Sequence, residues 1–313
     1  MKRTCLTFAL AIAAVYSTPV LAADDASCET ILMSDPGWTD INATNGVATV
    51  LLEALGYEPD IKTLSVPIGY QSMKNGDIDV FLGNWMPAQQ KFMDDLNEAK
   101  AVDVLAKNLT GAKFTLAVPS YVAEAGVKDF KDLNANADKF GREIYGIEPG
   151  APANSNIQKM IDANDFDLGD WSVVESGEQA MLAQVARNQD DEKWIVFLAW
   201  APHPMNSRFD IEYLSGGDDY FGPNYGGAEV YTLARTGWAE KCPNAAQLFR
   251  NLQFEVSMEN ELMGKILDDG QEPDAAARDW LKAHPQVIEP WLENVTTLDG
   301  QPGLPAVKDA LGL

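Results

Sequence analysis

Three tryptophans lie close to the ends of predicted strands, where a ligand would meet an α/β protein. Trp38 lies in G-W-T-D, Trp85 in G-N-W-M-P and Trp200 in A-W-A-P-H-P-M-N. The strand over 78–83 should end before Trp85, because Pro87 prevents a helix from starting at once. Ligands of α/β proteins bind beyond the carboxyl ends of the strands. We therefore expect the three indoles to converge on one cleft, although core packing is the alternative for any one of them.

A cluster of aromatic faces suits a quaternary ammonium ion. Such an ion has no N–H to donate, and its charge is spread over methyl groups, so aromatic rings bind it through apolar contact and their quadrupole together. Phe114, which opens an extended run, is a candidate fourth face. Asp40 would add a countercharge or an acceptor for a ligand hydroxyl. The alternative role for Asp40 is to cap a helix that begins near Asn42.

Catalytic and metal chemistry have little support in the sequence. The two histidines, His203 and His284, lack the cysteine or carboxylate spacing of a metal site. The chain also has no G-x-S-x-G elbow and no paired nucleophile and base. We therefore expect a binding protein that is not an enzyme, with no cofactor and no bound metal.

The N-terminus predicts export. Lys2 and Arg3 precede an apolar stretch over 6–16, and V-L-A provides a cleavage site after Ala22, so residues 1–22 read as a signal peptide. We expect a soluble periplasmic protein. The net charge of −24, from 47 acidic and 23 basic residues, argues against nucleic acid and anionic membranes as partners.

Strand-like runs alternate with helical patterns along the chain. The first unit is expected to hold strands over 30–33, 61–64 and 78–82 and helices over 42–56 and 68–76. The second is expected to hold strands over 144–150, 171–175 and 194–200 and helices over 154–164 and 176–187. Ser176 and Gln179 have the pattern of a capping box. This order predicts a mostly parallel sheet with right-handed crossovers.

Two extended runs, over 113–119 and 228–235, should join the two units. The predicted fold class is therefore α/β with two lobes, the second inserted in the first. Residues 23–112 and 215–313 would form lobe 1 and residues 113–214 lobe 2, with a ligand cleft between them. Cys28 and Cys242 remain after the signal peptide. An even pair in an exported chain favours a disulfide over two free thiols, and it would tie both ends of the chain to lobe 1.

Six segments resemble the choline-binding substrate receptors of bacterial quaternary-amine ABC importers. They are G-W-T-D, G-N-W-M-P, I-Y-G-I-E-P-G, A-W-A-P-H-P-M-N, Y-L-S-G-G-D-D and M-E-N-E-L-M-G-K-I-L. The resemblance covers nearly the whole chain after residue 22. It implies a type II periplasmic binding protein that closes over choline, acts as a monomer and delivers its ligand to an ABC permease in the inner membrane. It also implies box tryptophans at 38, 85 and 200, a hydroxyl-binding carboxylate at Asp40 and a Cys28–Cys242 disulfide.

Two positions depart from the pattern of that family. Phe114 stands in place of the box tyrosine, and Ala151 in place of the asparagine expected just after E-P-G. We expect Asn154 or Asn156 to replace the lost amide from the same loop. Alternatively the ligand differs and is glycine betaine, carnitine, trimethylamine N-oxide or dimethylsulfoniopropionate. Asp40 would repel the carboxylate of a betaine, which favours choline or a related methylamine.

Two alternatives from other functional classes stay open at this point. One is a secreted enzyme that acts on choline esters, although it would need a nucleophile–base pair. The other is a sensor subunit that reports the ligand to a membrane kinase, and its binding chemistry would be the same.

Overall fold

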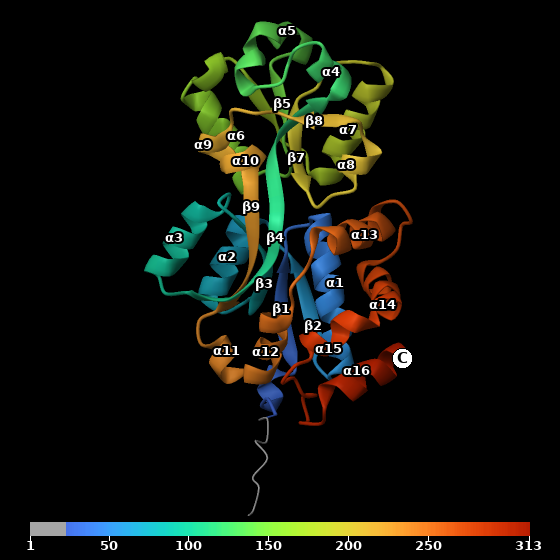
Figure 1. The fold of residues 1–313 in the computed structure, drawn as a ribbon. Helices are drawn as coiled ribbons and strands as arrows, with labels where there is room; N and C mark the ends of the chain where they lie inside the picture. Colours follow the sequence, from blue (N-terminus) through green and yellow to red (C-terminus); the bar gives the residue numbers. More distant parts are fainter. Residues whose placement is uncertain (1–22) are drawn as a thin grey trace, which may run out of the picture.

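The computed structural model describes residues 23–313, and the predicted signal peptide lies outside them. These residues form two α/β lobes, one above the other in Figure 1, with two long strands running between them. All the strands belong to one continuous sheet. Its order is β2-β1-β3-β9-β4-β7-β5-β6, and β8 pairs with β4 outside this path.

The first lobe is built on a short parallel sheet. Up to the first crossing it contains β1 (Thr30–Asp35), α1 (Thr39–Ala54), β2 (Glu58–Thr63), α2 (Val66–Asn75), β3 (Val80–Met86) and α3 (Gln90–Glu98). β1 pairs in parallel with β2 and with β3, so that Met33 is the partner of both Ile61 and Val80. Most of α1 is buried, because the helix packs between the sheet and two helices from the end of the chain, α13 (Val256–Leu267) and α14 (Pro273–Ala283).

The second lobe repeats this plan with shorter elements. It contains α4 (Ser120–Glu124), α5 (Ala137–Phe140), β5 (Glu143–Tyr145), α6 (Pro152–Asp162), β6 (Ser172–Val174), α7 (Glu178–Asp190), β7 (Phe197–Ala201), α8 (Met205–Arg208), β8 (Ile211–Tyr213), α9 (Asp218–Phe221) and α10 (Pro223–Gly226). α9 packs against α6, and both lie in the upper lobe of Figure 1. This packing supports a second lobe that extends to residue 226, beyond the boundary expected at 214.

The two crossings are made by β4 (Val102–Pro119) and β9 (Gly227–Arg235), which pair antiparallel along most of β9. β9 also pairs antiparallel with β3, and β4 with β7. The expectation of a mostly parallel sheet is therefore correct for β1, β2 and β3 and for β5, β6 and β7, and wrong for every pair that includes β4 or β9. The reason is geometric, because one crossing strand leaves lobe 1 and the other returns to it.

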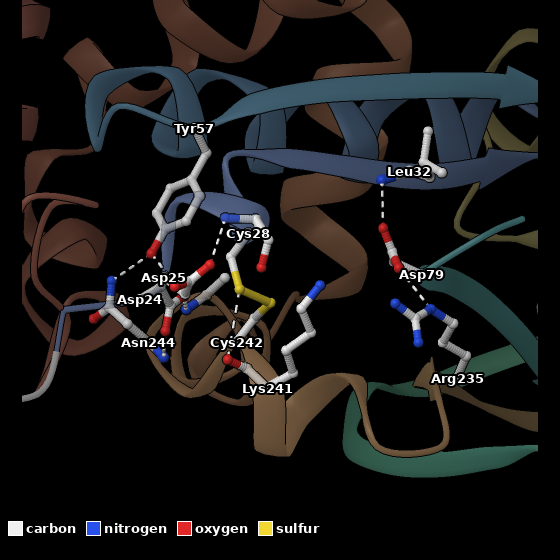
Figure 2. Close-up of a disulfide and its surroundings, with 12 residues drawn as sticks. Asp24, Asp25, Cys28, Leu32, Tyr57, Asp79, Arg235, Lys241, Cys242 and Asn244 are labelled. Carbon is white, nitrogen blue, oxygen red and sulfur yellow. Dashed lines mark hydrogen bonds and ion pairs between the residues drawn. A yellow bond between two sulfur atoms is a disulfide. The ribbon is translucent and has the colours of Figure 1, made fainter. Parts of the chain in front are cut away.

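The chain ends in lobe 1, where a disulfide joins the segment before β1 to the end of α11 (Figure 2). The remaining helices are α11 (Trp238–Lys241), α12 (Pro243–Asn251), α13, α14, α15 (Ile288–Trp291) and α16 (Gly303–Leu311). Cys28 and Cys242 are bonded across 214 positions, with their Cα atoms 5.7 Å apart, so the predicted disulfide is confirmed. Beside it, the Asp24 carboxylate accepts the N–H groups of Asn244 and Ala245 at 2.8 and 2.9 Å and thereby caps the start of α12.

Several predicted element boundaries are wrong. Trp85 lies inside β3, opposite Val230 of β9, and β7 begins at Phe197 instead of Trp194. Pairing with β9 supplies a ladder partner that extends β3 to Met86, past the predicted end. α1 begins at Thr39 instead of Asn42.

The predicted capping box at the start of α7 is also wrong. The N-cap of this helix is Gly177, and no side chain caps it. The Ser176 hydroxyl lies 3.5 Å from the carbonyl of Gly177 instead of bonding an amide of the first turn.

Candidate ligand site

A cavity lies between the two lobes. Its lining combines four aromatic side chains, two polar ones and several small or aliphatic ones. These are Trp38, Trp85, Phe114 and Trp200, then Asp40 and Gln89, and then Ala88, Ile147, Pro152, Ala153 and Leu198. None of these lining residues is basic. Such a cavity suits a small, largely apolar ligand that carries no negative charge.

The aromatic side chains reach the cavity from four separate elements. Trp38 is the N-cap of α1 and Trp85 comes from β3, both in lobe 1. Phe114 of β4 is the direct cross-strand partner of Trp200 of β7, so their side chains share a face of the sheet. The Trp85 and Phe114 rings meet edge to face, with their centroids 6.5 Å apart. The structure thus brings together the four aromatic residues that the sequence singled out.

Hydrogen bonds to the indole N–H groups orient two of the tryptophans. The Trp85 Nε1 donates to Oδ2 of Asp40 at 2.9 Å, and the Trp38 Nε1 donates to Oε1 of Glu148 at 2.9 Å. Because the N–H groups are already bonded, these rings have their faces and edges left for apolar and cation–π contacts.

Asp40 is the polar centre of the cavity. Its side chain is buried in the first turn of α1, and the N-cap of this helix is Trp38, so Asp40 is not the N-cap. Its second oxygen, Oδ1, has no hydrogen-bond partner among the described residues. A buried, unpaired carboxylate oxygen in a cavity is costly unless a ligand satisfies it.

Burial and, to a smaller extent, the nearby Glu178 carboxylate raise the pKa of Asp40 to about 7, although the bond from Trp85 opposes the shift. Glu259 of α13 is also buried, and both its burial and the charge of Asp40 hold its pKa well above the ordinary value. No basic side chain lines the cavity to offset these two carboxyl groups. A bound cation would therefore favour the ionised form of Asp40.

The three remaining candidates do not line the cavity. The amide of Asn154 bonds the backbone of Ile147 through both its oxygen and its nitrogen, at 3.0 and 3.1 Å. Asn156 donates to the carbonyl of Tyr220 at 3.0 Å, and Ala151 is the buried N-cap of α6. The expectation that Asn154 or Asn156 supplies a ligand amide is therefore not supported, because both amides are engaged with the protein.

Three polar residues near the cavity were missed by the sequence reasoning. Gln89 lines it, but its amide is held by Tyr70 and by the carbonyl of Gly83. Glu148 and Glu178 bond lobe 1 from lobe 2. Gln89 follows Trp85 closely and Glu148 lies in the E-P-G turn, so both positions could have been found. Nothing local distinguishes Glu178 or shows that either glutamate bonds lobe 1.

Residues 23–313 contain no cluster of three or more side chains able to hold a metal ion. Within the same residues, no helix has the length and apolar character needed to cross a membrane.

Comparison with known proteins identifies the family. The model of the substrate-binding domain of ABC-type glycine betaine transport systems matches residues 29–283, and the chain belongs to this family. It is 56% identical, with a TM-score of 0.91, to an ABC-transporter choline-binding protein in complex with choline, over 92% of this chain and 100% of that chain. The unliganded semi-closed conformation of an ABC-transporter choline-binding protein has a TM-score of 0.85 at 57% identity, with the same coverage.

A more distant relative is named for glycine betaine and carnitine instead of choline. The glycine betaine/carnitine transport binding protein GbuC of Listeria monocytogenes is 30% identical over 171 residues, which is 54% of each chain. The predicted family and the bilobed fold of type II periplasmic binding proteins are confirmed. The protein is a substrate-binding receptor of an ABC transporter.

Proposed function

We propose that this receptor binds choline, with its trimethylammonium group against Trp38, Trp85, Phe114 and Trp200 and its hydroxyl donating to Asp40. The observation that carries the proposal is the buried, unpaired Oδ1 of Asp40 inside an aromatic cavity. Such an oxygen needs a donor or a positive charge, and choline offers both. Each desolvated cation–π contact is worth about 2 kcal/mol, so four faces allow micromolar binding after ordering costs.

The charge of the cavity favours choline over the betaines. A betaine carries a carboxylate that needs a donor, and none of the lining residues is Arg, Lys or His. Asp40 would repel that carboxylate, and Glu178 lies near enough to affect the pKa of Asp40. Phe114 keeps an aromatic face without a phenol hydroxyl, which affects the polar half of the pocket and not the trimethylammonium contact.

Calorimetric titration of the purified protein tests the ligand. We expect micromolar or tighter binding of choline and weaker binding of glycine betaine, carnitine, trimethylamine N-oxide and dimethylsulfoniopropionate. Asp40→Asn should weaken choline binding and reduce the preference for choline over glycine betaine. Tighter binding of glycine betaine than of choline by the unmodified protein would overturn the choline proposal and retain the family.

The proposed role also includes a location in the cell and a partner in the membrane. We place the receptor in the periplasm as a monomer after removal of residues 1–22, where it would deliver choline to an inner-membrane permease without catalysis and without binding nucleic acid. Deletion of its gene should abolish choline uptake, whereas a sensor role would leave uptake intact. Incubation with acetylcholine should release no choline.

A further inference from the structure

The N-terminus of α1 is capped by a residue from the opposite lobe. The N-cap residue, Trp38, has a side chain that cannot accept the free amides of the first turn. Glu178 of α7 fills this role across the interface. Its Oε2 accepts the backbone N–H of Thr39 at 3.0 Å, and its Oε1 accepts the Thr39 hydroxyl. A carboxylate at this position also interacts favourably with the positive end of the helix dipole.

Glu178 is held in place by its own lobe. The side chain is 4% exposed, and Oε1 lies 3.2 Å from Nε2 of His203. The His203 Nδ1 accepts the N–H of Met205 at 2.9 Å, so the ring proton lies on Nε2 and is donated to Glu178. The His203 ring also contacts the ring of Trp200, with centroids 4.9 Å apart. The carboxylate is therefore linked to the ligand cavity through a cavity tryptophan.

A parallel bond lies one residue earlier in the chain. Trp38 donates its indole N–H to Glu148 of lobe 2, and Thr39 donates to Glu178. Two successive residues of lobe 1 are thus bound by two carboxylates of lobe 2, and the first of them is a cavity residue. Any separation of the lobes breaks both bonds and returns these groups to water.

We propose that Glu178 is a positioning residue that latches the closed form by capping α1 from the other lobe, and so controls how long the ligand stays bound. The inference rests on the proposed binding of a ligand between the lobes. Bonds that exist in only one conformation shift the population toward it. The latch therefore slows reopening, and with it the release of the ligand, while the encounter with the open form is unaffected.

Stopped-flow binding kinetics of Glu178→Gln with choline test the latch. Two bonds to a charged acceptor are lost, so the dissociation rate should rise about tenfold to a hundredfold. The association rate should stay within about threefold of the unmodified protein. A merely structural role for Glu178 would instead lower the melting temperature and leave the dissociation rate unchanged. An unchanged dissociation rate would overturn the proposal.

Matched variants separate the latch from a general weakening of the interface. Thr39→Val removes the hydroxyl from the lobe 1 side and should speed dissociation, whereas Thr39→Ser keeps both bonds and should behave as the unmodified protein. The double variant Thr39→Val with Glu178→Gln should dissociate no faster than Glu178→Gln alone. Arg208→Ala breaks only an exposed pair, 3.9 Å from Asp268 across the interface, and should have little effect.

Failure of the proposed function can be told apart from failure of the latch. If the unmodified protein binds none of the onium ligands, the proposed function fails, and the latch is then judged without ligand. Spin labels at Asp190 of α7 and Lys282 of α14, both exposed, report the distance between the lobes. Glu178→Gln should shift that distance distribution toward longer values. Identical distributions would overturn the latch as well.

Discussion

Among single residues, Asp40 determines the chemistry of the ligand cavity. Its carboxyl group is buried near two further carboxylates. The charge of Glu178 raises the pKa of Asp40, and the charge of Asp40 in turn raises the pKa of Glu259. One indole N–H, from Trp85, partly compensates its charge. The protein thus holds an acid whose charged form is incompletely stabilised until a cation arrives, and this makes binding sensitive to pH.

The first prediction is a loss of choline affinity in acid. The pKa of Asp40 is raised to about 7, so below that pH the ligand-free site is protonated and binding of the cation must release a proton. The dissociation constant should rise by up to about tenfold per pH unit below 7 and level off above it. Calorimetry between about pH 5 and about pH 8.5 gives the profile. Asp40→Asn should bind weakly with no such slope, and a slope that survives in this variant would contradict the assignment to Asp40.

The second prediction concerns Trp85, which has two functions in the site. Trp85→Phe keeps an aromatic face but loses the better cation–π surface and the bond to Asp40. The loss of about 1–2 kcal/mol should raise the dissociation constant for choline about five- to thirtyfold, measured by calorimetry.

Trp238→Phe is the matched control for Trp85→Phe. Trp238 is buried beside Phe249 and outside the cavity, so this variant should lower the free energy of unfolding and leave affinity unchanged. Equal loss of affinity in both variants would contradict a specific role for Trp85.

The aromatic half of the site could be predicted from the sequence because each tryptophan lies in a short, unusual motif beside glycine or proline. The carboxylates that bridge the lobes could not. Glu148 and Glu178 are two of 47 acidic residues, and their partners lie 110 and 139 positions away. The structure does not support the amide expected at Asn154 or Asn156, because both side chains are bonded to backbone groups and nothing local reveals this.

At the scale of elements, the crossing strands position the cavity residues. β3 was predicted too short because its extension depends on β9, which is far away in the chain. β4 and β9 approach closely at the point where β9 begins. Gly226 has φ of 72°, and a Cβ there would lie 1.7 Å from the carbonyl oxygen of Phe114. Only glycine allows this approach, and the backbone that it contacts carries a cavity side chain.

The third prediction follows from this contact. Gly226→Ala should lower the free energy of unfolding by more than about 2 kcal/mol, since the backbone of β4 or α10 must move. It should also weaken choline binding, because Phe114 moves with the strand. Gly237→Ala is the matched control, with φ of 80° and no atom within 4 Å of the added Cβ. The control should cost about 1 kcal/mol and leave affinity unchanged. Urea unfolding and calorimetry separate the two, and similar results for both would contradict the argument.

At the scale of the whole molecule, the two ends of the chain close one lobe around an insertion. The bond between Cys28 and Cys242 spans 214 positions, so the entire second lobe and both crossings lie inside the loop that it closes. This arrangement was predicted because two cysteines remained in an exported chain. The relative placement of the lobes followed from the alternation of helices and strands, whereas the antiparallel crossings required knowledge of where the chain returns.

The fourth prediction separates stability from binding at this scale. Replacing both cysteines by serine restores loop entropy to the unfolded chain, which in the chain-entropy model costs about 5 kcal/mol for a loop of this length. The midpoint of urea unfolding should fall accordingly, and dithiothreitol should produce a similar shift in the unmodified protein once the bond is reduced. Neither cysteine lines the cavity, and the cap that Asp24 provides to α12 is retained, so choline affinity should be unchanged. A variant with normal stability would show that residual structure already holds the unfolded ends together. A variant with weaker binding would show that the base of lobe 1 transmits strain to the ligand cavity, which the separation of the two sites argues against.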